Sequence, residues 1–594
     1  MFHRRTSLAR CFPIKMSGGD STGNIPAGDF DLLLFRRRRF RTAKACYPCR
    51  RRKVKCDLNQ PCGTCISREH PDLCDYTTNT FAGADPSTSE QSLDSREQQQ
   101  SEAANVNSTA SAMAQGVFVD LALPYGTKVH LGSESLPGVF SMAGQKGKDS
   151  SVKPLMDPKA IFELLCLQNS STTFPFTNLW MPGDGIEKVY SALPEDDVIL
   201  SHFRLYQESL FHLESSIINL LNFETSLQEF LQRRRNTPLD AFLEPLSVYP
   251  ISWFGLLFGM LACGAQLASI EGQLDTTKAW VFACCSFQCL RSCNFTSYPN
   301  IEVVQTLIML VNYLRNQGDA GASWSMLGLA IRLAQALGIH CTPDPHTISN
   351  TKEREEAIIK SSIWRSLVWQ DTLSSLCYDR PSGITVLESI PSTTSSPRFY
   401  SFFDSSHHLF VTANKISHSQ NQAKFSGERL PNETILDFRK IVNVIETRSV
   451  PHLQDLSKCQ SKNDYLQHYI FRLFSDSVMV CLYRPAMTGD ETQDSDITEY
   501  YLNRCRSALQ TYMELLKLNG AFQRLWFFVH ITFSCALILG QAANTQNVHA
   551  DKEFLKRFFH SVSENRAFVN LPVYENAWKL LREFLFANEP IMES

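Results

Sequence analysis

The chain has 594 residues, of which 43% are hydrophobic and 20% are charged. This length exceeds what one hydrophobic core usually organises and the composition excludes a wholly disordered protein, so we expect a small module joined to one or two larger domains. The net charge of -3 conceals one basic segment, because residues 36–55 contain eleven Lys or Arg and no acid, which leaves the rest of the chain at -14 and favours nucleic acid over membrane as the partner.

Residues 1–44 are expected to form a disordered basic arm, because they mix Gly, Ser and basic residues without an apolar period. The first sixteen residues contain no acid and faintly resemble a mitochondrial transit peptide, which is the alternative for this end. A second basic run in the arm is typical of a nuclear-import signal, and its charges also suit DNA phosphates or a merely solvated surface. It consists of Arg36, Arg37, Arg38, Arg39 and Arg41.

Residues 45–77 form a module with six cysteines: Cys46, Cys49, Cys56, Cys62, Cys65 and Cys74. Each of the two Cys-x-x-Cys pairs is expected to begin a short helix and to bind one zinc tetrahedrally, with a later cysteine completing each half. Six thiolates cannot fill two separate four-ligand sites, so two must bridge, and the near-twofold layout indicates Cys46 and Cys62. We therefore expect two Zn²⁺ per chain, and we expect the module to unfold without them because it has too few aliphatic residues to form a core.

Basic residues follow the first cysteine pair: Arg50, Arg51, Arg52, Lys53 and Lys55. Six thiolates and two zinc ions leave two excess negative charges, which this set of cations exceeds. The surplus indicates contacts with phosphates and base edges. The alternative is a zinc knot that joins two parts of the chain or binds another protein.

The cysteine spacing, the basic run and Pro61 directly before Cys62 together resemble the fungal Zn2Cys6 binuclear cluster transcription factors. The resemblance implies that the first helix enters the major groove of double-stranded DNA over a CGG triplet, with Arg52 and Lys53 contacting bases. Phosphate contacts are then expected from the remaining cations: Lys44, Arg50, Arg51 and Lys55.

Residues 78–153 are expected to be a flexible linker, because they are rich in Ser, Gln, Ala and Gly and lack an apolar heptad. No dimerising coiled coil is visible in this segment. A homodimer formed through the rest of the chain and a monomer aided by the basic arm therefore both stay open.

Residues 154–388 are expected to form an all-α domain. Apolar residues recur at helical spacing near 199–217, 301–315 and 324–337, and Gly338 suits a helix end. We find no strand-period segment of useful length. The uncharged run at 246–270 is long enough to span a membrane, but Pro250 and three glycines favour a buried core helix, so we expect no membrane association.

Two strings in this domain, at residues 304–340 and 364–384, resemble the regulatory domain common in the same fungal regulators, and the resemblance continues weakly through 482–487. The chain departs from the family pattern at Asp371-Thr372 and at Asp379-Arg380-Pro381. From the residues themselves, we expect a partly buried ionic network that fixes helix packing, with a ligand site as the alternative. Its members are Arg365, Asp371, Asp379 and Arg380.

Three thiols recur at helical spacing, at Cys285, Cys289 and Cys293. We interpret them as small core residues in preference to a redox or metal sensor. His340 is likewise interpreted as a helix-end residue in preference to a ligand.

Residues 389–431 are expected to be a loop-rich insertion, because Ser, Pro, Asn and His collect there. Residues 432–594 are expected to continue the helical array, with helices near 465–483, 500–518, 525–539 and 574–586.

The resulting hypothesis is a nuclear regulator of RNA polymerase II transcription. Its zinc cluster would bind CGG-type sites in DNA, and its helical body would control activity through coregulators or a metabolite. The genes that it regulates would belong to a specific metabolic pathway. The competing class is an all-α enzyme or metabolite-binding protein with an incidental zinc knot. The sequence shows no phosphate loop, nucleophile elbow or metalloprotease helix, so we expect no enzymatic activity.

Overall fold

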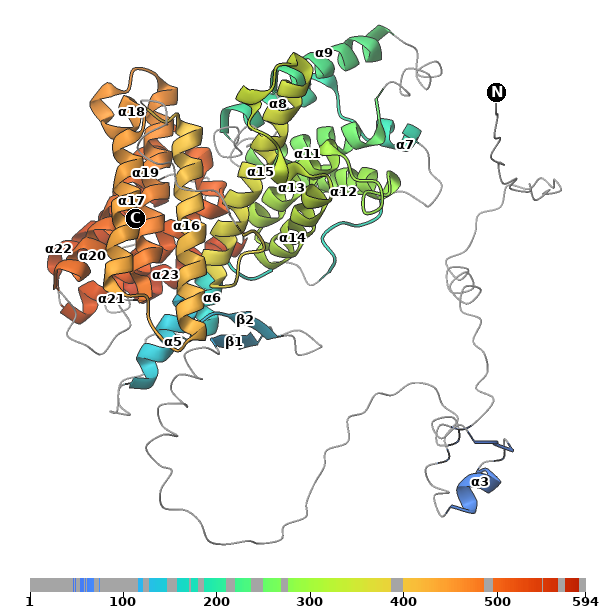
Figure 1. The fold of residues 1–594 in the computed structure, drawn as a ribbon, viewed down its shortest axis with the longest axis horizontal. Coiled ribbons are helices and arrows are strands. Elements are labelled where there is room, and N and C mark those ends of the chain that lie inside the picture. Colours follow the sequence, from blue (N-terminus) through green and yellow to red (C-terminus); the bar gives the residue numbers. More distant parts are fainter. Residues whose placement is uncertain are drawn as a thin grey trace, which may run out of the picture. The chain divides into compact units, whose positions relative to one another are not determined.

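The chain divides into two units, residues 1–97 and 98–594. A computed structural model describes part of each unit (Figure 1). The described residues are 46, 49, 54–57, 59, 61–68, 74, 116–120, 128–146, 157–169, 173–179, 186–209, 220–236, 249–268, 276–385, 399–485, 495–546, 548–564 and 572–586. The predicted basic arm at residues 1–44 lies outside them.

The second unit is a mainly helical body, which confirms the predicted fold class. Its first helices are α6 (Pro158–Leu164), α7 (Ile186–Ser191), α8 (Asp196–Ser209), α9 (Leu220–Asn236), α11 (Ile251–Leu267), α12 (Thr276–Ser292), α13 (Ile301–Gln317), α14 (Ala320–Ala336) and α15 (Thr351–Tyr378). Its later helices are α16 (Phe402–Phe425), α17 (Asn432–Arg448), α18 (Pro451–Gln454), α19 (Lys462–Tyr483), α20 (Ser495–Leu518), α21 (Trp526–Gln546), α22 (His549–Ser563) and α23 (Pro572–Phe586). Short 3-10 turns occur at Ile339–Cys341, Pro345–Thr347, Leu456–Lys458 and Gly520–Arg524.

Local capping sets the ends of several helices. The Asn300 side chain accepts a hydrogen bond from the Val303 N–H at the start of α13 (2.8 Å), and Gly318 ends this helix with φ of 92°. Gly338, with φ of 69°, follows α14 as its sequence position predicts. Ser461 and Asp464 form a reciprocal capping box at the start of α19.

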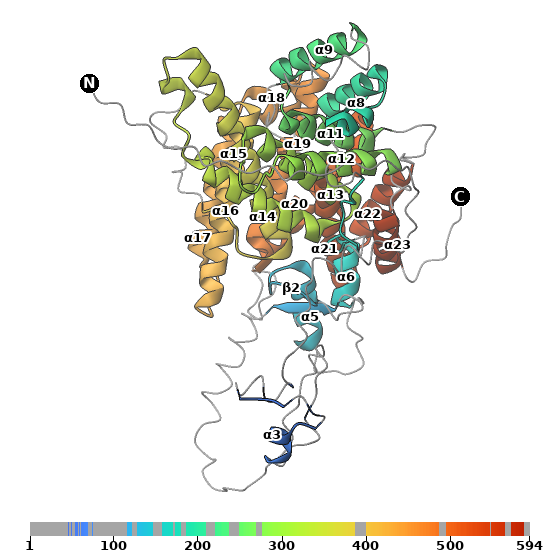
Figure 2. The ribbon, with the colours of Figure 1, turned by 90° about the vertical axis from the view of Figure 1, so that its right-hand side faces the viewer.

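The helices enclose one continuous hydrophobic core. Helix α11 packs between α8, α12 and α13, while α19, α20 and α21 pack in sequence, and α15 and α16 join the two groups (Figure 2). Helix α6 packs against α23, so among the described residues the first helix after residue 153 meets the last one.

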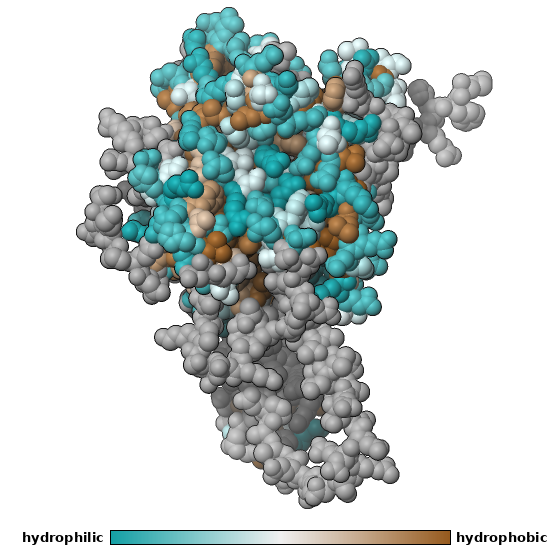
Figure 3. All heavy atoms as spheres, turned by 90° about the vertical axis from the view of Figure 1, so that its left-hand side faces the viewer, coloured by the Kyte–Doolittle hydropathy of each residue, from teal (hydrophilic) through white to brown (hydrophobic). Residues whose placement is uncertain are grey.

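Apolar helix α11 is buried along almost its whole length, which agrees with its interpretation as a core helix. Helix α21 is also long and apolar enough to cross a membrane, but 89% of its apolar window is buried inside the body. Figure 3 shows one face of the protein, on which hydrophilic side chains predominate and hydrophobic ones are scattered. A soluble core helix passes the same length and composition test as a membrane span.

The prediction of a flexible linker through residue 153 is wrong for residues 116–120 and 128–146. Strands β1 (Val117–Asp120) and β2 (Lys128–Leu131) pair antiparallel, with Val117 opposite Leu131, and helix α5 (Leu136–Lys146) follows them. Val119 and Leu131 are buried in the core of the body. Strands of this length present too few alternating positions for period-2 patterning to stand out, so they could not be predicted from the pattern of apolar residues.

Polar contacts fix this segment to the end of α15. The Gly132 N–H donates to the Tyr378 carbonyl (3.1 Å), and the Glu134 N–H donates to the Asp379 carboxylate (2.7 Å). A Cβ atom at Gly132 would lie 2.1 Å from the Asp379 carbonyl oxygen, so glycine is required by the close approach of the two backbones.

The prediction of a loop-rich insertion at residues 389–431 is also wrong over most of its length, because α16 occupies Phe402–Phe425. Ser401 caps its first turn by accepting a hydrogen bond from the Asp404 N–H (3.2 Å). The polar residues that gave the segment a loop-like composition make interior contacts instead. Asn414 donates to the Thr372 hydroxyl (3.2 Å), and Gln420 donates to the Cys481 carbonyl (3.2 Å).

The predicted ionic network at Arg365, Asp371, Asp379 and Arg380 does not form, because among the described residues each member has a different partner. Residues 365 and 371 lie on different faces of α15, and Asp379 leaves the helix in a left-handed conformation (φ 51°). The observed contacts are Arg365 with Asp404 (2.9 Å), Asp371 with the Ile384 N–H (2.9 Å), Asp379 with Lys424 (2.5 Å) and Arg380 with the His130 carbonyl (2.7 Å).

The cysteines on α12 lie in the core, as interpreted from the sequence. Cys285 and Cys289 are fully buried, and burial raises the pKa of both thiols, which makes them poor thiolate nucleophiles. Cys293 follows the helix and is half-buried. His340 is exposed in the turn after α14, where its ring lies beside Trp364.

Candidate metal centre and nucleic-acid interface

The second half of the cysteine module is organised by a short helix, α3 (Gly63–Ile66). Cys62 is its N-cap residue, and the Cys62 carbonyl accepts hydrogen bonds from the Cys65 N–H (2.9 Å) and the Ile66 N–H (3.0 Å). One turn of helix therefore presents the Cys62 and Cys65 thiols toward the same centre. The first helix that the sequence predicts, at the Cys46–Cys49 pair, falls mostly on residues outside the described ones.

The described thiols converge on two overlapping centres. One set comprises Cys46, Cys49, Cys56 and Cys62, and the other comprises Cys46, Cys62, Cys65 and Cys74; within each set the sulfur atoms lie within 4.8 Å of one another. The two sets share Cys46 and Cys62, which are the residues expected to bridge.

Sulfur separations in the module fit tetrahedral zinc. The Cys46 and Cys62 sulfurs are 3.7 Å apart, and the Cys49 and Cys62 sulfurs are 3.6 Å apart. With zinc–sulfur bonds of about 2.3 Å, a tetrahedron has sulfur–sulfur edges of about 3.8 Å, whereas a disulfide bond is about 2.05 Å long. The six cysteines are free thiols, so the donor set fits two zinc ions.

Crowding of the thiols perturbs their proton affinities. Burial raises the pKa of Cys65 to about 12. Burial also opposes ionisation of Cys62, but the hydrogen bond from the Cys65 backbone and the neighbouring thiols hold its pKa at about 6. When zinc is bound, it supplies the positive charge that stabilises all of the sulfurs as thiolates.

Asp57 supports the metal centre from outside the cysteine set, and it was not identified from the sequence. Its carboxylate accepts a hydrogen bond from the Gly63 N–H (2.9 Å) and contacts the Asn59 side chain (3.3 Å), and the bond from Gly63 lowers the pKa of Asp57. The Thr64 hydroxyl donates to the Lys55 carbonyl (2.9 Å), which ties the basic segment to α3. An acid shortly before a Cys-x-x-Cys helix was the available signal, because carboxylates suit helix N-termini.

Lys55 is the one predicted DNA-contacting residue among the described positions, and it is exposed. The proposed base-contacting residues Arg52 and Lys53 lie outside the described residues. So do the other phosphate-contacting candidates, Lys44, Arg50 and Arg51, and the run at residues 36–41.

Two family models match the chain. Residues 44–80 match the fungal Zn(2)-Cys(6) binuclear cluster domain, and residues 253–514 match the fungal specific transcription factor domain. The first match contains all six cysteines of the module, and the second runs from α11 into α20.

Curated relatives are similar over long segments at low identity. An uncharacterised transcriptional regulatory protein of Schizosaccharomyces pombe is 24% identical over 60% of this chain and 55% of its own length. The cutinase transcription factor 1 beta of Fusarium vanettenii is 22% identical over 58% of this chain and 42% of its own. The sorbicillinoid biosynthetic cluster transcription factor 2 of Penicillium rubens is 28% identical over 33% of this chain and 28% of its own. The chain thus spans about half the length, or less, of these relatives.

Proposed function

Because the chain carries both the binuclear zinc cluster domain and the helical domain of the fungal Zn(2)-Cys(6) transcription factors, we propose that it is a nuclear, sequence-specific regulator of RNA polymerase II transcription. The observation that carries this proposal is the pair of four-sulfur sets that share Cys46 and Cys62. Two zinc ions held this way stabilise a fold that is too small to form its own hydrophobic core.

We assign recognition of the DNA sequence to Arg52 and Lys53, which follow the first cysteine pair. Their side chains would reach guanine O6 and N7 of a CGG triplet. Lys44, Arg50, Arg51 and Lys55 are assigned to phosphates, where they set affinity and salt dependence. Exposure of Lys55, and the tie between its backbone and Thr64, support this placement on the outside of the cluster.

The helical body is proposed to control activity through coregulators and by forming a homodimer. Two of the relatives are named as regulators of cutinase and of a sorbicillinoid biosynthetic cluster. Control of a metabolic pathway is therefore the proposed role of this chain as well. The basic run at residues 36–41 is proposed to serve nuclear import.

The test uses the full-length protein purified with zinc. Metal analysis should give two zinc ions per chain, and fluorescence anisotropy should show tighter binding to a duplex containing CGG than to a scrambled duplex of the same composition. Replacing Arg52 with Ala should lower the preference for CGG about 5- to 150-fold, the equivalent of one bidentate base contact. Lys44→Ala is the matched control, because it should weaken binding to both duplexes equally and lower the salt slope by about one.

A chain that holds two zinc ions and binds both duplexes equally would contradict sequence-specific regulation. Zinc stoichiometry near one per chain would contradict the shared-ligand cluster. Fluorescent tagging of the chain in a fungal cell tests the nuclear location, and replacement of the arginines at 36–39 by Ala should reduce nuclear signal.

A further inference from the structure

Strand β1 is the first described element of the second unit, and one of its edges has no partner strand among the described residues. The strand follows residues 75–115, which separate it from the cysteine module and lie outside the described residues. It pairs with β2 on one side only, in a two-stranded sheet (Figure 1). Its other edge is a row of backbone groups that a further strand can bind.

The contacts of β2 show which backbone groups of β1 face this free edge. The His130 carbonyl accepts a hydrogen bond from Arg380 (2.7 Å), and the Gly132 N–H donates to the Tyr378 carbonyl (3.1 Å). Both residues of β2 thus turn their backbone groups away from β1. Because Phe118 lies opposite His130, the Phe118 N–H and carbonyl also point outward. They have no hydrogen-bond partner among the described residues.

The solvent-facing side chains of the sheet leave this edge open. Phe118 is 61% exposed, and its ring centroid lies 5.1 Å from that of His130. Beside these rings, Asp120 forms an ion pair with Lys128 across the two strands (3.6 Å), so the two charges balance within the chain. Protected edge strands carry unbalanced charges or proline, and β1 carries neither next to its exposed ring.

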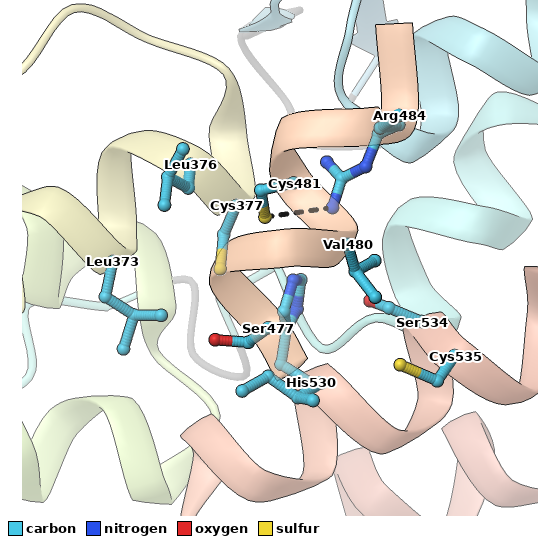
Figure 4. Close-up of a pocket in the computed structure, with 11 residues that line it drawn as sticks. Leu373, Leu376, Cys377, Ser477, Val480, Cys481, Arg484, His530, Ser534 and Cys535 are labelled. Carbon is cyan, nitrogen blue, oxygen red and sulfur yellow. Dashed lines mark hydrogen bonds between the residues drawn. The ribbon is translucent and has the colours of Figure 1, made fainter. Parts of the chain in front are cut away.

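The sheet is fixed to the helical body, so anything that binds β1 is held by the body. Val119 and Leu131 lie in the hydrophobic core. Shortly after β2, the Glu134 carbonyl accepts a hydrogen bond from Arg484 at the end of α19 (3.3 Å). Arg484 is itself held in place by a contact with the Cys481 thiol (3.4 Å; Figure 4).

We propose that two copies of this chain pair antiparallel through β1, with Phe118 of one copy opposite Phe118 of the other. This inference rests on the homodimer of the proposed function and assigns a surface to it. In this register the two Phe118 residues exchange both backbone hydrogen bonds, and their rings meet across a twofold axis. Asp120 then lies opposite Gly116 of the second copy, so no like charges face each other.

The position of β1 next to the undescribed segment favours a second copy as the occupant. Residues 78–115 contain no apolar heptad, so this segment supplies no coiled coil of its own. Pairing through β1 places the two Gly116 residues about 14 Å apart along the strands, at about 3.4 Å per residue. The two chains therefore leave the dimer toward their zinc modules from neighbouring points, which suits a site with two half-sites.

The small size of the strand sets the strength of the dimer. A strand of four residues buries little surface, so the dimer should be weak in the absence of DNA. A duplex with two CGG triplets should strengthen it, because binding of one zinc module raises the effective concentration of the other.

The experiment is sedimentation equilibrium of the full-length chain without DNA, over a range of protein concentrations. The wild type should show a reversible equilibrium between monomer and dimer. Phe118→Lys and Phe118→Asp should each raise the dissociation constant at least about tenfold, because each places two like charges opposite each other at the twofold axis. An equimolar mixture of the two variants should restore the dimer, since opposite charges then face each other.

Phe174→Lys is the matched control. Phe174 is another exposed phenylalanine of the body, at 65% exposure, and it lies outside the sheet, so its replacement should leave the dissociation constant unchanged. The mixture of the two Phe118 variants separates loss of contact from loss of folding, because two misfolded chains would not restore each other.

Three results would overturn the proposal. These are a wild-type chain that stays monomeric at its highest soluble concentration, a dimer that Phe118→Lys leaves intact, and a mixture of the two Phe118 variants that stays monomeric. The second result would place the homodimer on another surface without contradicting the proposed function. A failure of the proposed function would instead appear as equal binding to CGG and scrambled duplexes, which this measurement does not involve.

Discussion

Acidification should destabilise the helical body through one buried residue, His530. Burial is the main cause that lowers the pKa of this imidazole to about 4, and the nearby Arg484 charge acts in the same direction. The side chain is 5% exposed, and its ring stacks on Trp526 with centroids 5.0 Å apart. The folded protein therefore holds this histidine neutral, while the unfolded chain protonates it near pH 6.5.

The sign and size of the effect follow from linkage. Because the folded pKa is depressed, the stabilisation is fully present above about pH 6.5 and is lost as the pH falls toward 4. With these two pKa values, His530 alone removes about 2 kcal/mol between pH 7.5 and pH 5 and about 3 kcal/mol by pH 4. Losses of this order are a large part of the total stability of a typical domain.

The assay is urea unfolding of the wild-type protein and of His530→Gln at several pH values between 5 and 7.5. Glutamine keeps a donor for the Leu165 carbonyl but does not titrate. Other groups titrate equally in both proteins, including Glu134, whose pKa burial raises to about 7, so the difference in unfolding free energy isolates His530. Fluorescence and circular dichroism must give coincident transitions for this comparison. Parallel pH profiles for the two proteins would refute the reasoning.

Other substitutions test the metal centre and the packing of the body. Cys62→Ser should release both zinc ions because its sulfur belongs to both four-sulfur sets, whereas Cys74→Ser should release about one; metal analysis of the purified variants decides. Gly132→Ala should cost about 1–3 kcal/mol in urea unfolding because its new methyl would overlap a backbone carbonyl, and an unchanged midpoint would contradict that close approach. Asp476→Ala should cost about 2–4 kcal/mol because it removes the closer of the two carboxylates that pair with buried Arg504 and leaves only Glu446 at 3.4 Å, while the exposed Asp437→Ala should cost less than about 1 kcal/mol.

The metal-binding residues could be predicted from the sequence because the spacing of the cysteines determines which of them can bind the same metal ion. A Cys-x-x-Cys pair binds a metal only if one turn of chain places both sulfurs on one side, so the interval between residues carries the geometry. Helices such as α13 were also accessible, because Asn300 and Gly318 mark its two ends beside a strong apolar period.

Elements stabilised mainly by distant contacts could not be predicted in the same way. Helix α16 has a polar composition, and it becomes a helix because Asn414 and Gln420 find partners on α15 and α19, far away in sequence. Likewise, the burial of Arg484 among apolar side chains could not be predicted, because nothing in its local sequence distinguishes it from the other arginines. Composition reports the cost of burying a polar group, but only the fold shows whether a partner is present.

Because α6 packs against α23, the packing of the first part of the helical body depends on residues near the C-terminal end of the sequence. A nonsense mutation just before Pro572 would remove α23, which packs against α6, and with it the Tyr574 hydroxyl that donates to the Asn316 carbonyl (3.2 Å). The truncated protein would keep all six zinc-binding cysteines but would expose the apolar surface that α23 covers. Exposed apolar surface of this kind makes a protein a substrate for the quality-control machinery of the cell.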